Sequence, residues 1–153
     1  MKSQKKQIYR KAVFIVVYRI NQETKKPEYI LLKRKLHWKG WEFPKGGIDK
    51  NETILQTVKR ETKEETGFKP MKIINFNIKV KYKYAKILKD RPSVIGQTYH
   101  LLAAEINPKD NKIKMDTTEH SSFIWLPFKE AIKKLTWNNQ KKALRIVNSR
   151  LEK

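Results

Sequence analysis

Five acidic residues of this chain are gathered in the stretch that runs from Gly46 to Phe68, and they are Asp49, Glu52, Glu61, Glu64 and Glu65. The clustering stands out in a protein whose 36 Lys and Arg residues outnumber its 15 Asp and Glu residues, for a net charge of +21. Carboxylate oxygens are the ligands that hard divalent cations prefer. We therefore expect this stretch to concentrate negative charge for a cation.

The same stretch carries signals for the start and the end of a helix. Thr53 and Gln56 have the spacing of a capping box. Gly67 suits the left-handed residue that follows a helix. The predicted helix lies between these signals, and its expected apolar stripe consists of Ile54, Leu55 and Val58.

Three of the acids stand at i, i+3 and i+4 of the predicted helix, namely Glu61, Glu64 and Glu65. Residues at this spacing project from the same side of a helix. Three like charges so close repel one another. The pattern indicates either a solvated acidic surface or a site for a divalent ion such as Mg²⁺, which would cancel the repulsion.

The wider spacing resembles the signature box of the Nudix hydrolase family, through Gly46, Glu52, Arg60-Glu61, Lys63, Glu64-Glu65, Thr66, Gly67 and Phe68. Thr62 departs from the pattern, because the family prefers a bulky aliphatic residue there, and we expect slightly weaker packing beneath the helix. Asn51 stands where many members carry glycine, and Asn is the residue that best replaces Gly at positive φ. The resemblance implies a pyrophosphohydrolase.

The resemblance also implies roles for residues inside the box. Glu64 and Glu65 match the positions that ligate the metal, and Glu61 matches a position that serves as a ligand or as the catalytic base. The carbonyl of Gly46 often completes the metal shell in the family. A further pair, Glu52 and Arg60, matches residues that join the loop to the helix, and we interpret it as structural.

Outside the box, two segments are similar to those of the diadenosine tetraphosphate hydrolases. They are Pro44-Lys45-Gly46 and Glu119-His120 followed by Trp125. This similarity implies that Lys45 binds phosphate and that catalytic Glu119 lies near the metals as a further ligand or base. The alternative for Lys45 is an ordinary surface lysine, and the alternative for Glu119 is a solvated turn residue.

Three other residues are candidates for contacts with a nucleotide. Trp137 and Tyr82 lie near places where the diadenosine tetraphosphate hydrolases have rings that stack on adenine, so the resemblance implies that both bind a base. The polar segment around Trp137 also argues against a core position for it. Strict alternation over residues 74–84 puts Tyr82 with the apolar positions and puts lysines on the opposite face, so a core position for Tyr82 is the alternative. His37, in the loop before the box, is expected to contact phosphate.

These residues together predict a Mg²⁺-dependent pyrophosphohydrolase, with Mn²⁺ as the alternative metal. The expected substrates are dinucleoside polyphosphates such as diadenosine tetraphosphate, which would be cleaved into nucleoside mono- and triphosphate. The first alternative is a decapping-like enzyme that acts on RNA 5′ ends. The second is a catalytically idle Nudix domain that binds RNA, although the full set of Glu61, Glu64 and Glu65 argues against idleness.

Length and composition indicate one domain over residues 1–153, with no cysteine for disulfides or thiol catalysis. The basic start followed by a short apolar run is predicted to be a buried strand rather than a signal peptide. No run is long enough to cross a membrane, so we expect a soluble protein of the cytoplasm. We also expect a monomer. The charge of +21 favours polyanionic partners, or else reflects a lysine-rich proteome.

The arrangement of apolar and polar residues predicts alternating strands and helices. Strands are expected over residues 8–20, 28–34, 74–84, 97–106 and 123–126, and helices over 54–66, 128–135 and 138–151. One charged helix between strands, followed by two C-terminal helices, is typical of an α/β protein. We predict an α/β/α sandwich with a mixed β-sheet, as the Nudix resemblance also implies.

Overall fold

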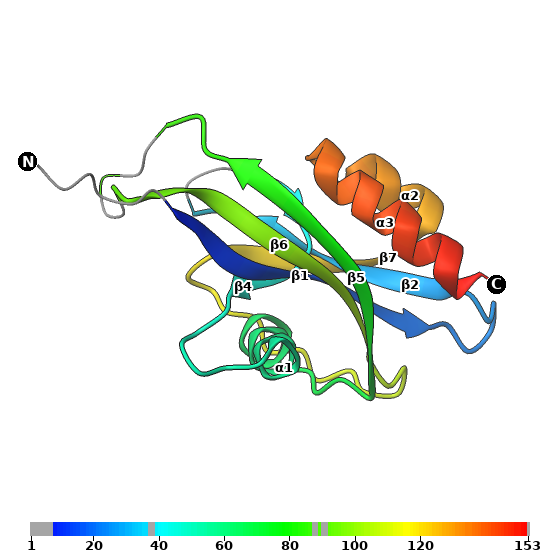
Figure 1. Ribbon diagram of the computed structural model, residues 1–153. Coiled ribbons are helices and arrows are strands. Elements are labelled where there is room, and N and C mark those ends of the chain that lie inside the picture. Colours follow the sequence, from blue (N-terminus) through cyan, green and yellow to red (C-terminus); the bar gives the residue numbers. More distant parts are fainter. Residues whose placement is uncertain (1–7, 37–38, 87–88, 90–91, 153) are drawn as a thin grey trace, which may run out of the picture.

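The computed structural model describes residues 8–36, 39–86, 89 and 92–152. Across these residues, seven strands form one sheet and three helices pack on it (Figure 1). The strands are β1 (Ile8–Ile20), β2 (Pro27–Arg34), β3 (Gly40–Glu42), β4 (Lys45–Gly47), β5 (Lys72–Lys83), β6 (Val94–Glu105) and β7 (His120–Pro127). The helices are α1 (Ile54–Thr66), α2 (Phe128–Lys134) and α3 (Asn138–Leu151).

The sheet is mixed because its two central strands run parallel while the others pair antiparallel. The order is β3-β2-β1-β6-β5, and β4 and β7 pair with β1 and β2 outside this path. β1 and β6 are the parallel pair. α1 lies on one face of the sheet, and α2 and α3 lie together on the other (Figure 1). The predicted α/β/α sandwich is confirmed.

Each face of the sheet has its own hydrophobic core, because successive residues of β1 point to opposite faces. Phe14 and Val16 belong to the cluster that packs against α2 and α3. Val13 and Ile15 belong to the cluster that contains Val58 of α1. These four β1 side chains are at most 7% exposed. The strand is apolar on both faces because helices cover both, as the continuous apolar run predicted.

The helix that carries the acidic cluster begins and ends as predicted. Thr53 and Gln56 form the capping box, in which the Gln56 backbone N–H donates to Thr53 Oγ1 (3.1 Å) and the Thr53 N–H donates to Gln56 Oε1 (2.9 Å). Gly67 ends the helix in the left-handed conformation, with φ of 81°. Asn51, in the loop before the helix, has φ of 68°, as its resemblance to glycine led us to expect.

One residue of the expected apolar stripe is on the wrong side of α1. Leu55 is 49% exposed, so its prediction as a packing residue is wrong. The buried side of the helix follows Val58, Thr62 and Glu65, at i, i+4 and i+7. The helix turns this side to the sheet because β1 supplies Val13 and Ile15 there. The carboxylate of Glu65, which is on this buried side, therefore lies between the helix and the sheet.

The long edge strand β5 keeps its predicted alternation, but its apolar side is buried only in the first half of the strand. Ile74, Phe76 and Ile78 pack against the core beneath α3. The register with β6 then shifts between Asn75 and Lys79, and past this irregularity Tyr82 is 48% exposed. A core position for Tyr82 is therefore wrong. This end of the sheet borders a cleft rather than the helices, so its apolar side is open.

The two C-terminal helices have nearly the predicted bounds. α3 spans the expected residues, and α2 ends one position earlier, at Lys134. Their buried residues, among them Leu144 and Val147, complete the core on that face. None of the helices in the described part of the chain is both long enough and apolar enough to span a membrane.

The buried hydroxyl of Thr62 generates a prediction about stability. Thr62 is fully buried, and its Oγ1 has no hydrogen-bond partner among the described residues. A buried polar group without a partner costs about 1–3 kcal/mol. Thr62→Val replaces the hydroxyl with a methyl group of similar size, so the free energy of unfolding in urea should rise by about 1 kcal/mol. Thr62→Ser keeps the hydroxyl and removes the methyl group, and it should be less stable than wild type. A lower urea midpoint for Thr62→Val would contradict this account.

Candidate active site

A cleft of about 670 Å³ opens where β1, β5 and β6 meet the start of α3. Most residues that the sequence singled out line it, although they come from distant segments: Lys45, Gly46, Glu61, Glu65, Tyr82, Glu119 and Trp137. His37 lies outside the described residues. The fold therefore gathers carboxylates, a lysine and aromatic side chains around one hollow.

The carboxylates form the inner wall of the cleft. Glu65 is 5% exposed, and one of its oxygens lies within 4.8 Å of a carboxylate oxygen of Glu119 and a ring nitrogen of His120. Glu61 approaches the backbone of Gly46 so closely that a Cβ at that position would overlap its carboxylate. Glycine is thus required at position 46, where β4 passes α1.

The burial of these acids opposes their ionisation. Desolvation raises the pKa of Glu65 well above its usual range, and the nearby Glu61, Glu42 and Glu119 raise it further. Burial also raises the pKa of Glu61, although Arg60 opposes the shift. A divalent cation would neutralise this repulsion, and its preferred ligands are the carboxylate oxygens present. The residues therefore fit Mg²⁺ or Mn²⁺.

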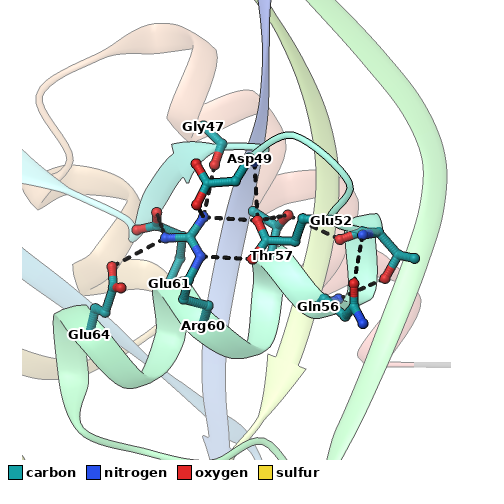
Figure 2. A network of polar contacts seen from close by, with 9 residues as sticks. Gly47, Asp49, Glu52, Gln56, Thr57, Arg60, Glu61 and Glu64 are labelled. Carbon is teal, nitrogen blue, oxygen red and sulfur yellow. Dashed lines mark hydrogen bonds and ion pairs between the residues drawn. The ribbon is translucent and has the colours of Figure 1, made fainter.

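Arg60 ties the loop before α1 to the helix (Figure 2). It donates through Nε to Glu52 Oε2 (2.8 Å) and through Nη2 to Glu52 Oε1 (3.0 Å), a bidentate pair. Nη2 also donates to the carbonyl of Gly47 (3.0 Å), and Nη1 donates to Glu61 Oε1 (2.7 Å). Hydrogen bonds from Arg60 and Thr57 lower the pKa of Glu52 to about 2. The pair thus holds β4 against the carboxylate side of α1.

Glu64 differs from its two neighbours in the acidic cluster. Its side chain is 54% exposed, and Arg60 Nη1 donates to its Oε2 at 3.3 Å (Figure 2). It is absent from the cleft lining that contains Glu61 and Glu65. The structure therefore gathers Glu61 and Glu65 in the cleft and leaves Glu64 outside its lining. The expected role of Glu64 as a metal ligand stays a prediction.

A buried ionic network below the cleft was missed by the sequence analysis. Glu42 is fully buried, and its Oε2 accepts hydrogen bonds from His120 Nε2 (2.7 Å) and Arg34 Nη1 (3.1 Å). Its Oε1 lies 3.3 Å from Lys45 Nζ. Arg34 Nη1 also contacts Glu119 Oε2 at 3.3 Å. One carboxylate therefore orients both Lys45 and, through Arg34, Glu119.

The charge state of Glu42 follows from these partners. Burial favours the neutral acid, but the hydrogen bond from His120 and the charges of Lys45 and Arg34 hold the pKa of Glu42 below its usual range. The sequence did contain a signal for this residue. Glu42 stands between Trp41 and Phe43 in a short apolar segment, and a carboxylate buried among apolar residues requires cationic partners.

The aromatic side chains lie farther out in the cleft. Trp137 precedes the first residue of α3 and is 47% exposed, and Tyr82 is 48% exposed. Tyr82 contacts Tyr84 edge to face, with ring centroids 6.2 Å apart. Half-exposed rings that line a hollow offer flat surfaces for a planar ligand group. Their expected contact with a base stays a prediction.

The chain resembles proteins of known class over most of its length. The family described as NUDIX domain matches residues 8–145. An RNA pyrophosphohydrolase from a Nitratiruptor species is 33% identical over 136 residues, which is 86% of each chain. A second RNA pyrophosphohydrolase, from Pseudoalteromonas translucida, is 32% identical over 105 residues, with 60% of this chain and 61% of the relative covered.

Solved structures share the fold. A C. elegans Ap4A hydrolase in a binary complex matches with a TM-score of 0.74 and 25% identity, over 94% of this chain and 98% of the other. The E. coli dihydroneopterin triphosphate pyrophosphohydrolase matches with a TM-score of 0.72 and 22% identity, over 94% and 99%. At that identity the second match speaks for the fold alone.

The repulsion among the buried acids leads to a prediction about Glu65. Glu65→Gln removes a buried charge while its amide oxygen is still able to accept from the Lys45 backbone N–H, which now donates to Glu65 at 3.3 Å. The melting temperature of the metal-free variant should rise by roughly 2–4 °C for each kcal/mol of relieved repulsion. Added Mg²⁺ should stabilise the wild type more than the variant, because ligand binding to the folded state raises stability. Equal Mg²⁺-induced shifts in thermal melts would contradict the participation of Glu65 in a metal site.

The buried network leads to a second prediction. Glu42→Leu removes the anion shared by Arg34, Lys45 and His120. Loss of one partner of a buried ion pair costs about 3–5 kcal/mol, and urea unfolding should show a loss of that order. Glu42→Gln, which keeps the shape and an acceptor oxygen, should lose less. A Glu42→Leu protein with the wild-type urea midpoint would show that the network does not stabilise the fold.

Proposed function

The chain belongs to the NUDIX domain family, and on that basis we propose that it is a Mg²⁺-dependent pyrophosphohydrolase of dinucleoside polyphosphates. A compound such as diadenosine tetraphosphate would be cleaved into nucleoside mono- and triphosphate. The observation that carries the proposal is the cleft itself. It combines buried carboxylates, the Lys45 side chain and two half-exposed aromatic rings within one hollow.

The inner part of the cleft suits a polyphosphate chain. Glu61 and Glu65, with the carbonyl of Gly46, would hold the metal. When bound, Mg²⁺ would offset negative charge on the phosphate oxygens. Lys45, oriented by Glu42 on its far side, would add a compact positive charge along the polyphosphate.

The reaction requires one water and one base. The water oxygen forms a bond to a phosphorus atom, while the bond from that phosphorus to the bridging oxygen breaks. The bridging oxygen leaves with the remaining phosphates, and the proton of the water passes to a carboxylate of the cluster. Glu119 suits the last role because its side chain is 38% exposed to the cleft while Arg34 Nη1 holds one of its oxygens.

The outer part of the cleft favours a substrate with more than one base. Tyr82 at the end of β5 and Trp137 before α3 line the cleft from two different elements, and each is about half exposed. A dinucleoside substrate has a base at each end for such rings. The similarity to the C. elegans Ap4A hydrolase supports this choice of substrate.

A second candidate is the 5′ end of RNA, and the curated relatives favour it. Those reported above are named RNA pyrophosphohydrolase. In that case the cleft would take a 5′-triphosphate and release pyrophosphate, while one ring would contact the first base. The same carboxylates and Lys45 would serve both reactions. An idle binding domain would have no use for carboxylates gathered along the wall of the cleft, one of them nearly fully buried.

One assay separates these functions. The purified protein is incubated with Mg²⁺ and, in turn, diadenosine tetraphosphate, free nucleoside triphosphates and 5′-triphosphorylated RNA. We expect AMP and ATP from diadenosine tetraphosphate at the highest kcat/KM. A higher kcat/KM on triphosphorylated RNA would replace our first candidate by the second, and no product from any substrate would overturn both.

The aromatic side chains provide the prediction that tests base binding. Stacking of one base contributes about 1–3 kcal/mol, and the base lies far from the reacting phosphorus. Trp137→Ala should therefore raise KM for diadenosine tetraphosphate by roughly 5- to 150-fold and leave kcat nearly unchanged, as expected for uniform binding. Thermal melts serve as the control, since a half-exposed side chain should have little effect on stability. A normal KM with a much lower melting temperature would make Trp137 a structural residue.

A further inference from the structure

The edge strand β5 presents different chemistry on its two sides. Beyond the register shift, Val80 and Tyr82 pair in register with Tyr99 and Gln97, and three of these four residues line the cleft: Tyr82, Gln97 and Tyr99. The alternate residues of the same segment are Lys79, Lys81 and Lys83. They point to the other face, the one that α1 covers farther along the sheet. All three lysines are exposed.

The register of the sheet extends this basic surface over three strands. Lys83 lies opposite Gly96, which lies opposite Tyr9, and Lys81 lies opposite Thr98, which lies opposite Lys11. In the next row, Lys79 lies opposite His100. Residues in register share a face of the sheet. We call this surface the lysine face, and it comprises Tyr9, Lys11, Lys79, Lys81, Lys83, Thr98 and His100.

The like charges of the lysine face lie close enough to influence one another. Burial lowers the pKa of His100, and the charges of Lys79 and Lys11 lower it further. No residue of the lysine face is acidic. In Figure 1 the end of β5 lies at the upper left of the sheet, away from α1. A concentration of positive charge of this kind attracts a polyanion.

An aromatic ring lies among the lysines. The Nζ atom of Lys81 lies 4.6 Å from the centroid of the Tyr9 ring. A Cβ at Gly96 would overlap the backbone carbonyl oxygen of Tyr82 and would lie 2.8 Å from Tyr9 Cε1. The absence of a side chain at Gly96 thus leaves room for both the neighbouring strand and the Tyr9 ring. Basic side chains around a ring are the elements of a site for single-stranded nucleic acid, in which cations bind phosphates and rings stack on bases.

We propose that the lysine face binds single-stranded nucleic acid, through backbone phosphates at the lysines and a base at Tyr9. A membrane surface fits less well, because the exposed apolar side chains of β5, Val80 and Tyr82, lie on the opposite face. A duplex fits less well, because its stacked bases are closed to the Tyr9 ring. The inference does not rest on the substrate of the cleft.

Binding is measured with a fluorescent 5′-hydroxyl oligonucleotide, which carries no polyphosphate to hydrolyse. The triple variant Lys79→Gln, Lys81→Gln and Lys83→Gln should bind about tenfold or more weakly, and its salt dependence, log K against log salt, should become shallower by about 2. The matched control is Lys129→Gln, Lys133→Gln and Lys142→Gln, which removes the same charge from exposed positions on α2 and α3. The control should bind like wild type, and both variants should unfold in urea like wild type.

Tyr9 tests the stacking half of the proposal. Tyr9→Leu should weaken binding by roughly 5- to 150-fold, whereas Tyr9→Phe, which keeps the ring, should bind like wild type. Single-stranded RNA and DNA should both bind, and a duplex of equal length should bind more weakly. Equal losses in the two lysine triples would overturn the proposal, because they would mean that net charge alone drives binding. Equal binding of duplex, or lysine-dependent binding to phosphatidylserine vesicles in place of oligonucleotide, would also overturn it.

If the lysine face does not bind nucleic acid, that result can be distinguished from a failure of the proposed hydrolysis. The oligonucleotide would bind without turnover, and the proposed hydrolysis of diadenosine tetraphosphate would take place in the cleft, on the opposite side of β5. The lysine triple should therefore hydrolyse diadenosine tetraphosphate at the wild-type rate. Loss of oligonucleotide binding with normal hydrolysis is the expected result, and loss of hydrolysis with normal binding would count against the inference.

Discussion

Buried negative charge is the constraint on which the rest of the structure depends. Glu42 and Glu65 are both nearly inaccessible to water, and Glu61 lies beside them. Carboxylates in such a position are stable only if cations or hydrogen bonds compensate them. Arg60 pairs with Glu61 and Arg34 pairs with Glu42, while Glu65 accepts a hydrogen bond from the Lys45 backbone N–H. These contacts offset part of the negative charge, and a bound Mg²⁺ would offset the rest.

This arrangement explains why a strongly basic protein has an acidic site. The compensating cations are committed to particular carboxylates: Arg60 to Glu52 through two hydrogen bonds, and Arg34 to Glu42 and Glu119 through Nη1. The other cations lie largely at the surface, where they influence which molecules approach. In our proposals, attraction of a polyanion over the surface and binding in the cleft are thus separate tasks that fall to different residues.

The central sheet serves both tasks because alternate residues of a strand point to opposite faces. In β5 this places Tyr82 on the cleft and Lys81 on the lysine face. The strand lies at the edge of the sheet, so both faces of its free end are accessible. A nucleotide held in the cleft and a chain held on the lysine face would lie on the two sides of one strand, separated only by its backbone.

The local features of this protein were determined by its sequence alone. The capping box at Thr53, the left-handed Gly67 and the continuous apolar run of β1 depend on neighbours a few residues away, so they were predictable. The family pattern located Glu61 and Glu65 for the same reason, since their spacing lies within one helix.

The tertiary structure decided the rest. Glu42 and His120 are 78 residues apart in sequence, and Arg34 and Glu119 are 85 apart, so their contacts exist only because β2 pairs with both β3 and β7. Likewise, the alternating sequence of β5 did not indicate which of its apolar residues would lie under a helix and which would line the cleft. Local propensity acts over a few bonds, whereas burial and charge pairing depend on which distant strands become neighbours.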